Sequence, residues 1–214
     1  MSLKFRVTQA TLAAIFCLCL TNSSLAHDLD DGVVERDCQI VVFPDRVEIQ
    51  YMLEMNSSTR DAIAKAEKFS LAKTSRNGIP TTDPEAVRKA WDDFREKFAT
   101  RLACKLSVKI AGKSQKLQVA KSETIEKHSI RLFFTLVAKH KVTTAATALE
   151  IADKNFSAQQ GYLRMALKGR RGVEVAKSSA PPTVSSLTRE PLSKLSKDEQ
   201  QERRQVQAEF QLGS

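Results

Sequence analysis

Histidines are the first residues to consider for metal binding or acid–base chemistry, because imidazole can do both near neutral pH. The chain has three of them, His27, His128 and His140. No two are four residues apart, the spacing that places a pair on one face of a helix around a shared metal. The sequence also lacks the GxSxG, HExxH and CxxC motifs and a glycine-rich phosphate loop. We therefore expect a protein that is not an enzyme.

The N-terminal segment 1–26 has the pattern of a cleavable signal peptide. Two basic residues precede an unbroken apolar stretch at 12–20, and Ser24 and Ala26 are the small residues that signal peptidase accepts beside a cleavage site. A membrane anchor is the alternative, but it needs about 20 apolar residues, roughly twice this length. We therefore expect cleavage after Ala26 and a mature chain that works outside the cytoplasm, in the periplasm or secreted.

Cleavage at this position would make His27 the first residue of the mature protein. Its α-amino group and one imidazole nitrogen could then hold a divalent metal such as copper, nickel or zinc. Nearby carboxylates could add oxygen ligands: Asp28, Asp30 and Asp31. The alternative is an ordinary residue that happens to follow a signal peptide. His27 is the candidate metal ligand of this chain.

Two cysteines follow the signal peptide, Cys38 and Cys104. Cys38 alternates with Ile40, and Cys104 alternates with Leu106, so both are expected on apolar strand faces. Such a pair in an exported protein is a candidate disulfide, because the compartment is oxidising. The alternative is two buried free thiols that act as small apolar side chains.

The chain is basic, with 34 Lys and Arg against 25 Asp and Glu and a net charge of +9. Such a balance suits an anionic partner, for example envelope phosphates, acidic polysaccharides or nucleic acids. The basic residues are interleaved with acidic ones, however, and only Lys168–Arg171 is a compact run. No basic stripe is combined with exposed aromatic residues, as in a nucleic-acid groove. Nucleic acid is therefore not an expected partner, and most of these charges are expected on a solvated surface.

A β-hairpin followed by two helices is predicted for the first half of the mature chain. A strand at 38–43 leads into 47–55, where apolar and polar residues alternate as in a half-buried strand. Residues 57–100 then lose this alternation. The second helix of this insertion is predicted to begin at Pro84, after Asp83 as N-cap, and its apolar residues recur every three or four positions.

Alternation returns at Leu102 and predicts further strands in the segments 102–110, 116–119, 130–138, 147–151, 161–168 and 173–175. Together with the hairpin they make about eight strands separated by turns. This pattern is typical of an antiparallel β-sandwich. The predicted fold is therefore mostly β, with one sandwich domain at 27–177 that carries the two-helix insertion.

The character of the chain changes after this domain. Serine and proline residues predict a linker at 178–195. Ser196 and Glu199 then have the spacing of a capping box. A charged helix with a thin apolar edge is predicted at 196–212.

Several short segments resemble the extracytoplasmic N-terminal domain of bacterial nickel/cobalt transporter-like membrane proteins. They lie at both ends of residues 26–181. The matching segments are Ala26-His27, the strand Asp45-Arg46-Val47-Glu48-Ile49-Gln50-Tyr51-Met52-Leu53-Glu54-Met55, then Asp153-Lys154-Asn155-Phe156 with Gly161-Tyr162, and the exit strand Val173-Glu174-Val175-Ala176-Lys177-Ser178-Ser179-Ala180-Pro181.

The chain also departs from this family. Asp28-Leu29-Asp30 replaces the usual Pro-Leu-Gly, Tyr162 replaces a tryptophan, and no apolar span follows Ala26 to form the membrane transporter. The resemblance implies a non-catalytic accessory domain associated with divalent metal (nickel or cobalt) transport through a separate membrane transporter. The alternative is a basic envelope-binding or structural protein that interacts with anionic polymers of the cell surface.

Correctly processed protein that begins at His27, as confirmed by intact mass, is expected to bind Ni(II), Co(II), Cu(II) or Zn(II) with modest affinity in a calorimetric titration. Both nitrogens must be deprotonated, so binding should weaken as pH falls below about 7.7 and then about 6.5. Equal binding by His27→Ala, or by protein that carries an extra residue before His27, would contradict this site.

Overall fold

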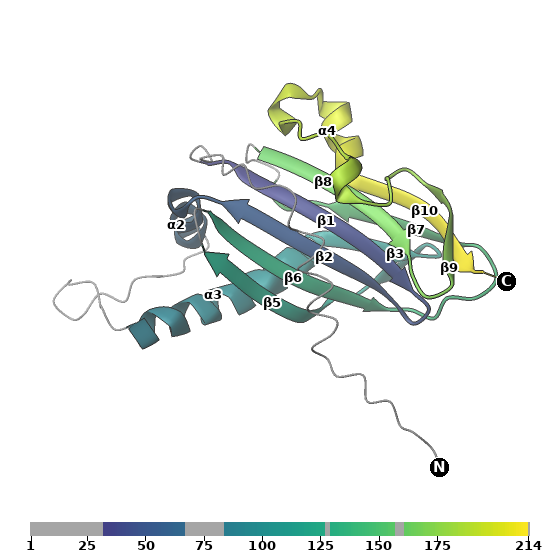
Figure 1. The fold of residues 1–214 in the computed structure, drawn as a ribbon, viewed down its shortest axis with the longest axis horizontal. Coiled ribbons are helices and arrows are strands. Elements are labelled where there is room, and N and C mark those ends of the chain that lie inside the picture. Colours follow the sequence, from purple (N-terminus) through teal and green to yellow (C-terminus); the bar gives the residue numbers. More distant parts are fainter. Residues whose placement is uncertain (1–31, 67–83, 127–128, 157–160, 214) are drawn as a thin grey trace, which may run out of the picture.

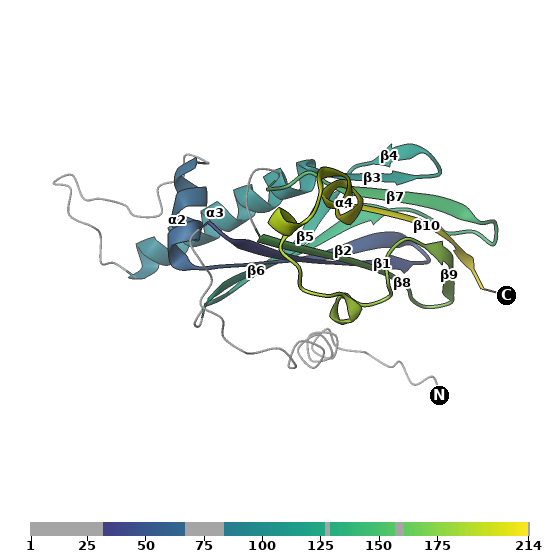
Figure 2. The same ribbon diagram turned by 90° about the horizontal axis from the view of Figure 1, so that it is seen from above.

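Two β-sheets packed face to face make up most of the computed structural model, which describes residues 32–66, 84–126, 129–156 and 161–213. Within these residues each sheet has five strands. Figure 2 shows the two sheets edge-on as separate layers. The predicted mostly β fold with a helical insertion is therefore confirmed, and its ten described strands exceed the eight predicted. The predicted signal peptide and His27 lie outside the described residues.

The first sheet is built around the predicted hairpin. In spatial order its strands are β5 (Gln118–Glu126), β6 (Ile130–Lys139), β2 (Arg46–Met55), β1 (Val34–Phe43) and β8 (Gly161–Gly169). Every second residue of β2 is buried, as its alternation predicted. β8 runs parallel to β1, so this sheet is not wholly antiparallel. Gly161 begins β8 with φ +140°, and a side chain there would collide with the Val34 carbonyl group.

The second sheet is antiparallel throughout its described pairs. In spatial order its strands are β4 (Lys113–Gln115), β3 (Leu106–Ile110), β7 (Thr147–Asp153), β10 (Gln205–Leu212) and β9 (Val173–Ser178). β10 comes last of these in the chain but lies between β7 and β9. β10 is therefore an inserted strand, distant in sequence from both of its neighbours in the sheet.

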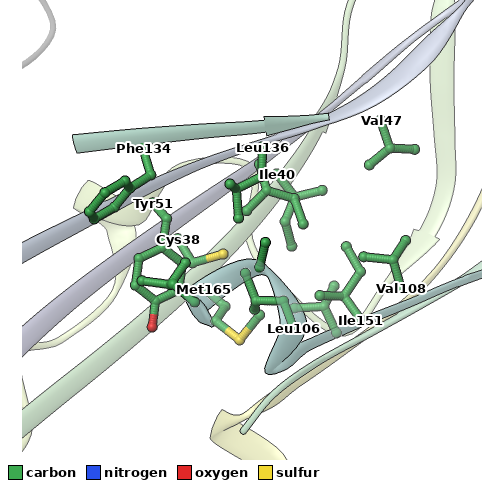
Figure 3. Packing of buried hydrophobic residues seen from close by; sticks show 14 of the residues in the cluster. Cys38, Ile40, Val47, Tyr51, Leu106, Val108, Phe134, Leu136, Ile151 and Met165 are labelled. Atoms are coloured by element: carbon green, nitrogen blue, oxygen red, sulfur yellow. The ribbon is translucent and has the colours of Figure 1, made fainter. Parts of the chain in front are cut away.

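One apolar core fills the space between the sheets. Ile40 and Leu136 of the first sheet are fully buried, and Val108 and Ile151 of the second are almost fully buried. Figure 3 shows these side chains pointing toward one another from the two layers. Their burial is the main contribution to stability, since each fully buried aliphatic side chain contributes about 1.5–3 kcal/mol.

The helical insertion consists of α2 (Ser57–Ala66) and α3 (Pro84–Cys104). α3 begins at Pro84 as predicted but continues beyond residue 100, so the strand predicted from Leu102 is wrong at its start. Phe94, Phe98 and Leu102 follow one another at intervals of four and are all buried, which is a helical spacing. Among the described residues, no helix is both long and apolar enough to cross a membrane.

The predicted tail helix is correct only in its first part. α4 (Lys197–Arg203) begins with the predicted capping box, in which Ser196 accepts from the Glu199 backbone N–H and Glu199 accepts from that of Ser196. The rest of the predicted helix, after Arg203, is wrong because it forms β10. Val206 and Phe210 are four residues apart, which suits a helix as well as a strand. Ala208 between them is also buried, and this period of two is that of a strand.

The segment predicted as a linker packs against the first sheet. It contains two short 3₁₀ turns, η1 (Val184–Ser186) and η2 (Leu192–Lys194), and the Leu192 side chain is buried. The Pro181 carbonyl oxygen accepts a hydrogen bond from the Leu167 N–H of β8. Figure 2 shows this segment crossing the outer side of the first sheet before the chain returns as β10. It therefore covers the β8 edge of that sheet.

Replacing Phe210 by alanine is expected to lower the free energy of unfolding by about 3–5 kcal/mol, because the ring is fully buried. Gln207→Ala, on the exposed side of the same strand, should change it by less than about 0.5 kcal/mol. Urea unfolding of both variants measures the difference. If both variants changed the free energy of unfolding by equally small amounts, Phe210 would not be buried, as expected for the exposed tail helix that the sequence predicted.

Candidate functional site

The two cysteines do not form a functional pair in the structure. Cys38 is fully buried in β1, whereas Cys104 is exposed at the end of α3, and both are free thiols. The prediction that Cys104 lies on an apolar strand face is wrong, because α3 extends through it, and the predicted disulfide is not formed. Burial raises the pKa of the Cys38 thiol well above its usual range, with the charge of Asp153 adding to the effect. Cys38 therefore stays protonated and acts as a small apolar side chain.

Ionisable side chains meet inside the fold in a buried polar cluster, which consists of Arg36, Tyr51, Asp153, Asn155 and Arg204. Both carboxylate oxygens of Asp153 are in use. Oδ1 accepts from the backbone N–H and the side-chain amide of Asn155, each at 2.8 Å. Oδ2 accepts from the Tyr51 hydroxyl at 2.7 Å and lies 3.6 Å from Nη1 of Arg36. The buried charge of Asp153 is therefore fully compensated.

Two arginines of the cluster share one acceptor. The Asn155 carbonyl oxygen accepts from Nη1 of Arg36 at 2.8 Å and from Nη1 of Arg204 at 2.9 Å. Partial burial lowers the pKa of Arg204, and the nearby positive charge of Arg36 lowers it further. The Arg36 guanidinium also lies 5.8 Å from the centre of the Phe156 ring. The cluster thus holds two cations around a single carboxylate.

This cluster joins the two sheets. Arg36 and Tyr51 belong to the first sheet, whereas Asp153 ends β7 and Arg204 precedes β10 in the second. Burial raises the pKa of the Tyr51 hydroxyl well above its usual range, so it remains a hydrogen-bond donor. Arg36, Tyr51, Asp153 and Asn155 are each at most 3 % exposed. The Asp-x-Asn-Phe segment that carries the family resemblance is therefore a structural element here.

A second group of charges lies at the opposite end of β1, where three chain connections meet (Figure 1). We define the basic end as Arg46, Lys139, Lys141, Lys168, Arg170 and Arg171. Strand pairing brings its members together, since Arg46 lies opposite Lys139 and Lys168 lies opposite Val41 of β1. The Arg170 N–H donates to the Val42 carbonyl at 2.9 Å, which attaches the β8–β9 turn to the end of β1. Segments distant in sequence therefore form one positive surface.

The ring of Phe43 contacts two arginines of the basic end. The Arg46 guanidinium lies 4.1 Å from the centre of its ring, and the Arg171 guanidinium lies 5.6 Å from it. Arg46 pairs with the acidic side chains of Asp45 and Glu48. Lys139, Lys141 and Arg170 are exposed and form no ion pair with any described residue. These three charges are therefore available to an anionic partner.

His140 lies between Lys139 and Lys141 in the sequence, but its ring faces the second sheet. Its ring is half-buried and packs edge-on against Phe210, with ring centres 5.9 Å apart and an interplanar angle of 87°. Nε2 is buried without a hydrogen-bond partner among the described atoms. Burial lowers the pKa of His140 below its usual value.

A cleft between α3 and β5, lined by described residues, mixes charges of both signs. It is lined by Asp92, Arg95, Glu96, Val119, Ala120, Lys121 and Ser122. Asp92 pairs with Arg95 at 2.9 Å, and Lys121 pairs with Glu123 at 2.7 Å. This cleft has no excess of one charge, so it offers less to a charged ligand than the basic end.

The metal prediction stays a prediction. His27 and His128 lie outside the described residues, and the described ones contain no group of three His, Cys, Asp or Glu side chains that could hold a metal. No protein-family model and no curated protein matches this chain. The resemblance to metal-transport proteins therefore rests on the short motifs alone.

Replacing Asp153 by alanine is expected to lower the free energy of unfolding by about 3–5 kcal/mol, because Arg36 would remain buried without its carboxylate. Glu150→Ala is the matched control on the same strand, since Glu150 makes only an exposed pair with Lys109. Its effect should be at most about 1 kcal/mol. Chemical denaturation measures both variants, and similar small losses would show that the cluster does not join the sheets.

Proposed function

We propose that this chain is a non-catalytic, extracytoplasmic binding domain that holds anionic polymers of the cell envelope at its basic end. The observation that carries the proposal is the convergence of Lys139, Lys141, Arg170 and Arg171 at one end of the sandwich, all of them exposed. A polymer with repeated negative charges can contact several such cations at once, and each contact near an anionic surface contributes about 1 kcal/mol.

The form of the basic end favours a polymer over a small ligand. Its cations lie on turns and strand ends, and the cleft described above is formed by α3 and β5, away from it. Small ligands are usually enclosed in a concave site, whereas an extended polyanion needs only spaced charges on an open surface.

An envelope polymer also suits this surface better than a nucleic acid. Base stacking requires free aromatic rings, but the Phe43 ring is contacted by the guanidinium groups of Arg46 and Arg171. The predicted signal peptide supports a location where envelope phosphates and acidic polysaccharides are the abundant polyanions.

The family resemblance supports a second proposal, association with divalent metal transport through a membrane partner. The motif residues Asp153 and Asn155 are structural in this chain. The metal role therefore depends on His27, and the calorimetric titration given above tests it.

Reversing two charges, in Lys139→Glu with Arg170→Glu, is expected to weaken binding to a soluble acidic polysaccharide roughly ten- to a hundredfold. The double variant Lys113→Glu with Lys116→Glu is the matched control, because it changes the net charge equally at exposed positions of the β3–β5 region. Calorimetry at several salt concentrations measures both, and wild-type affinity should fall as salt screens the contacts.

Equal weakening in the two double variants would mean that net charge alone governs binding, and it would contradict a site at the basic end. The absence of binding by the wild-type protein at low salt, both to the acidic polysaccharide and to long-chain polyphosphate, would contradict the proposed function itself.

A further inference from the structure

Arg171 occupies a strained position in the turn that connects β8 to β9. Its φ angle is +55°, in the left-handed region that favours glycine and asparagine. Gly172 after it has φ +82°, and the Val173 N–H donates to the Arg170 carbonyl at 3.3 Å, so the turn has the φ values and the closing hydrogen bond of type I′. Arginine is unusual at such a position, and strained residues cluster at functional sites. This one is exposed at the basic end.

The backbone on either side of Arg171 is attached to the rest of the fold. The Arg170 N–H donates to the Val42 carbonyl of β1 at 2.9 Å. The Gly172 carbonyl accepts from the Gly213 N–H, just after β10, at 2.7 Å. Hydrogen bonds to both sheets therefore hold the turn, and the side chain of Arg171 extends from a fixed backbone.

Phe43 also restricts the far end of the Arg171 side chain. The guanidinium lies 5.6 Å from the centre of the Phe43 ring, within the range of a cation–π attraction. The ring also carries Arg46, at 4.1 Å, but Asp45 and Glu48 pair with that arginine. Arg171 forms no ion pair with any described residue. Its charge is thus held in position and is also available to an anion.

We infer that Arg171 is the anchoring contact of the basic end, the cation on which the affinity for a polyanion depends most. The inference rests on the proposed function and assigns its main binding residue. A flexible surface side chain loses conformational freedom when it binds, which weakens the contact. Arg171 is already ordered by its turn and by Phe43, so less is lost. Its guanidinium can also donate two parallel hydrogen bonds to one phosphate or carboxylate group. Phe43 is then a positioning residue that acts through Arg171.

The first test replaces two neighbouring arginines of the turn. Arg170→Asn removes one charge from a residue that contacts no aromatic ring among the described residues. Its affinity for long-chain polyphosphate, measured by calorimetry, should fall about fivefold, as expected for one contact. Arg171→Asn removes the same charge but also the preordered contact, so its affinity should fall at least about twentyfold.

Stability should move in the opposite direction from affinity at this position. Arg171→Asn creates Asn-Gly, the pair that type I′ turns favour, so the midpoint of urea unfolding should stay the same or rise. Ala111→Asn is the matched control, because Ala111 has φ +50° and precedes Gly112 in the β3–β4 turn. It should have the same effect on the unfolding midpoint and leave polyphosphate binding unchanged.

The second test concerns Phe43 and keeps every charge in place. Phe43→Leu retains an apolar side chain but removes the ring, so affinity should fall about threefold with the salt dependence unchanged. In the Arg171→Asn background the same substitution should have no further effect, because its partner is already lost. If Phe43→Leu folds poorly, the comparison of the two arginine variants still decides.

Equal losses of affinity in Arg171→Asn and Arg170→Asn would overturn the inference and leave the proposed function intact, since charge alone would then govern binding. A lower unfolding midpoint for Arg171→Asn than for the wild type would assign the arginine a structural role and would also overturn it. A Phe43→Leu effect of the same size in both backgrounds would show that Phe43 does not act through Arg171. No binding of polyphosphate or acidic polysaccharide by the wild type would remove both the inference and the proposed function.

Discussion

The carboxylate of Asp153, buried where the two sheets meet, is the constraint on which the rest of the fold depends. A buried charge must be compensated by partners, and here they come from β1, from β2 and from the backbone after β7. The turn that Asn155 makes around this carboxylate orients its own carbonyl oxygen toward Arg36 and Arg204. Arg204 leads into β10, and its carbonyl oxygen accepts from the Asp153 N–H at 2.8 Å. One charge thus helps to determine how both sheets are joined and where the inserted strand begins.

The two ends of the sandwich differ in the burial of their charged side chains. At the end that holds Arg36, the charges of Arg36 and Asp153 are buried and satisfied by fixed partners. At the other end of β1, Lys139, Lys141 and Arg170 are exposed on strand ends and turns. A rigid framework keeps these cations close together despite their mutual repulsion, and an anionic partner would relieve that repulsion.

Patterns that are local in sequence predicted a large part of this structure. The hairpin of β1 and β2, the start of α3 at Pro84 and the capping box at Ser196 were all predictable, because each depends on neighbouring residues. The predictions failed where two local structures fit one pattern. Val206 and Phe210 suit either a helix edge or a strand face, and pairing with β7 and β9 selected the strand. At Cys104, the helical stripe of α3 prevailed over an alternation that also suited a strand.

By itself the sequence determined the mostly β class, the helical insertion and the excess of basic residues, since periodicity and composition need no knowledge of distant contacts. It also contained both halves of the basic end, the run Lys168–Arg171 and the two lysines around His140, but only as separate features. Strand order and register decided that these halves are neighbours, because Arg46 pairs opposite Lys139 while β8 lies beside β1. The same packing placed His140 against Phe210 and buried Asp153. Such juxtapositions follow from the burial of one shared core by strands far apart in the chain, which no local pattern encodes.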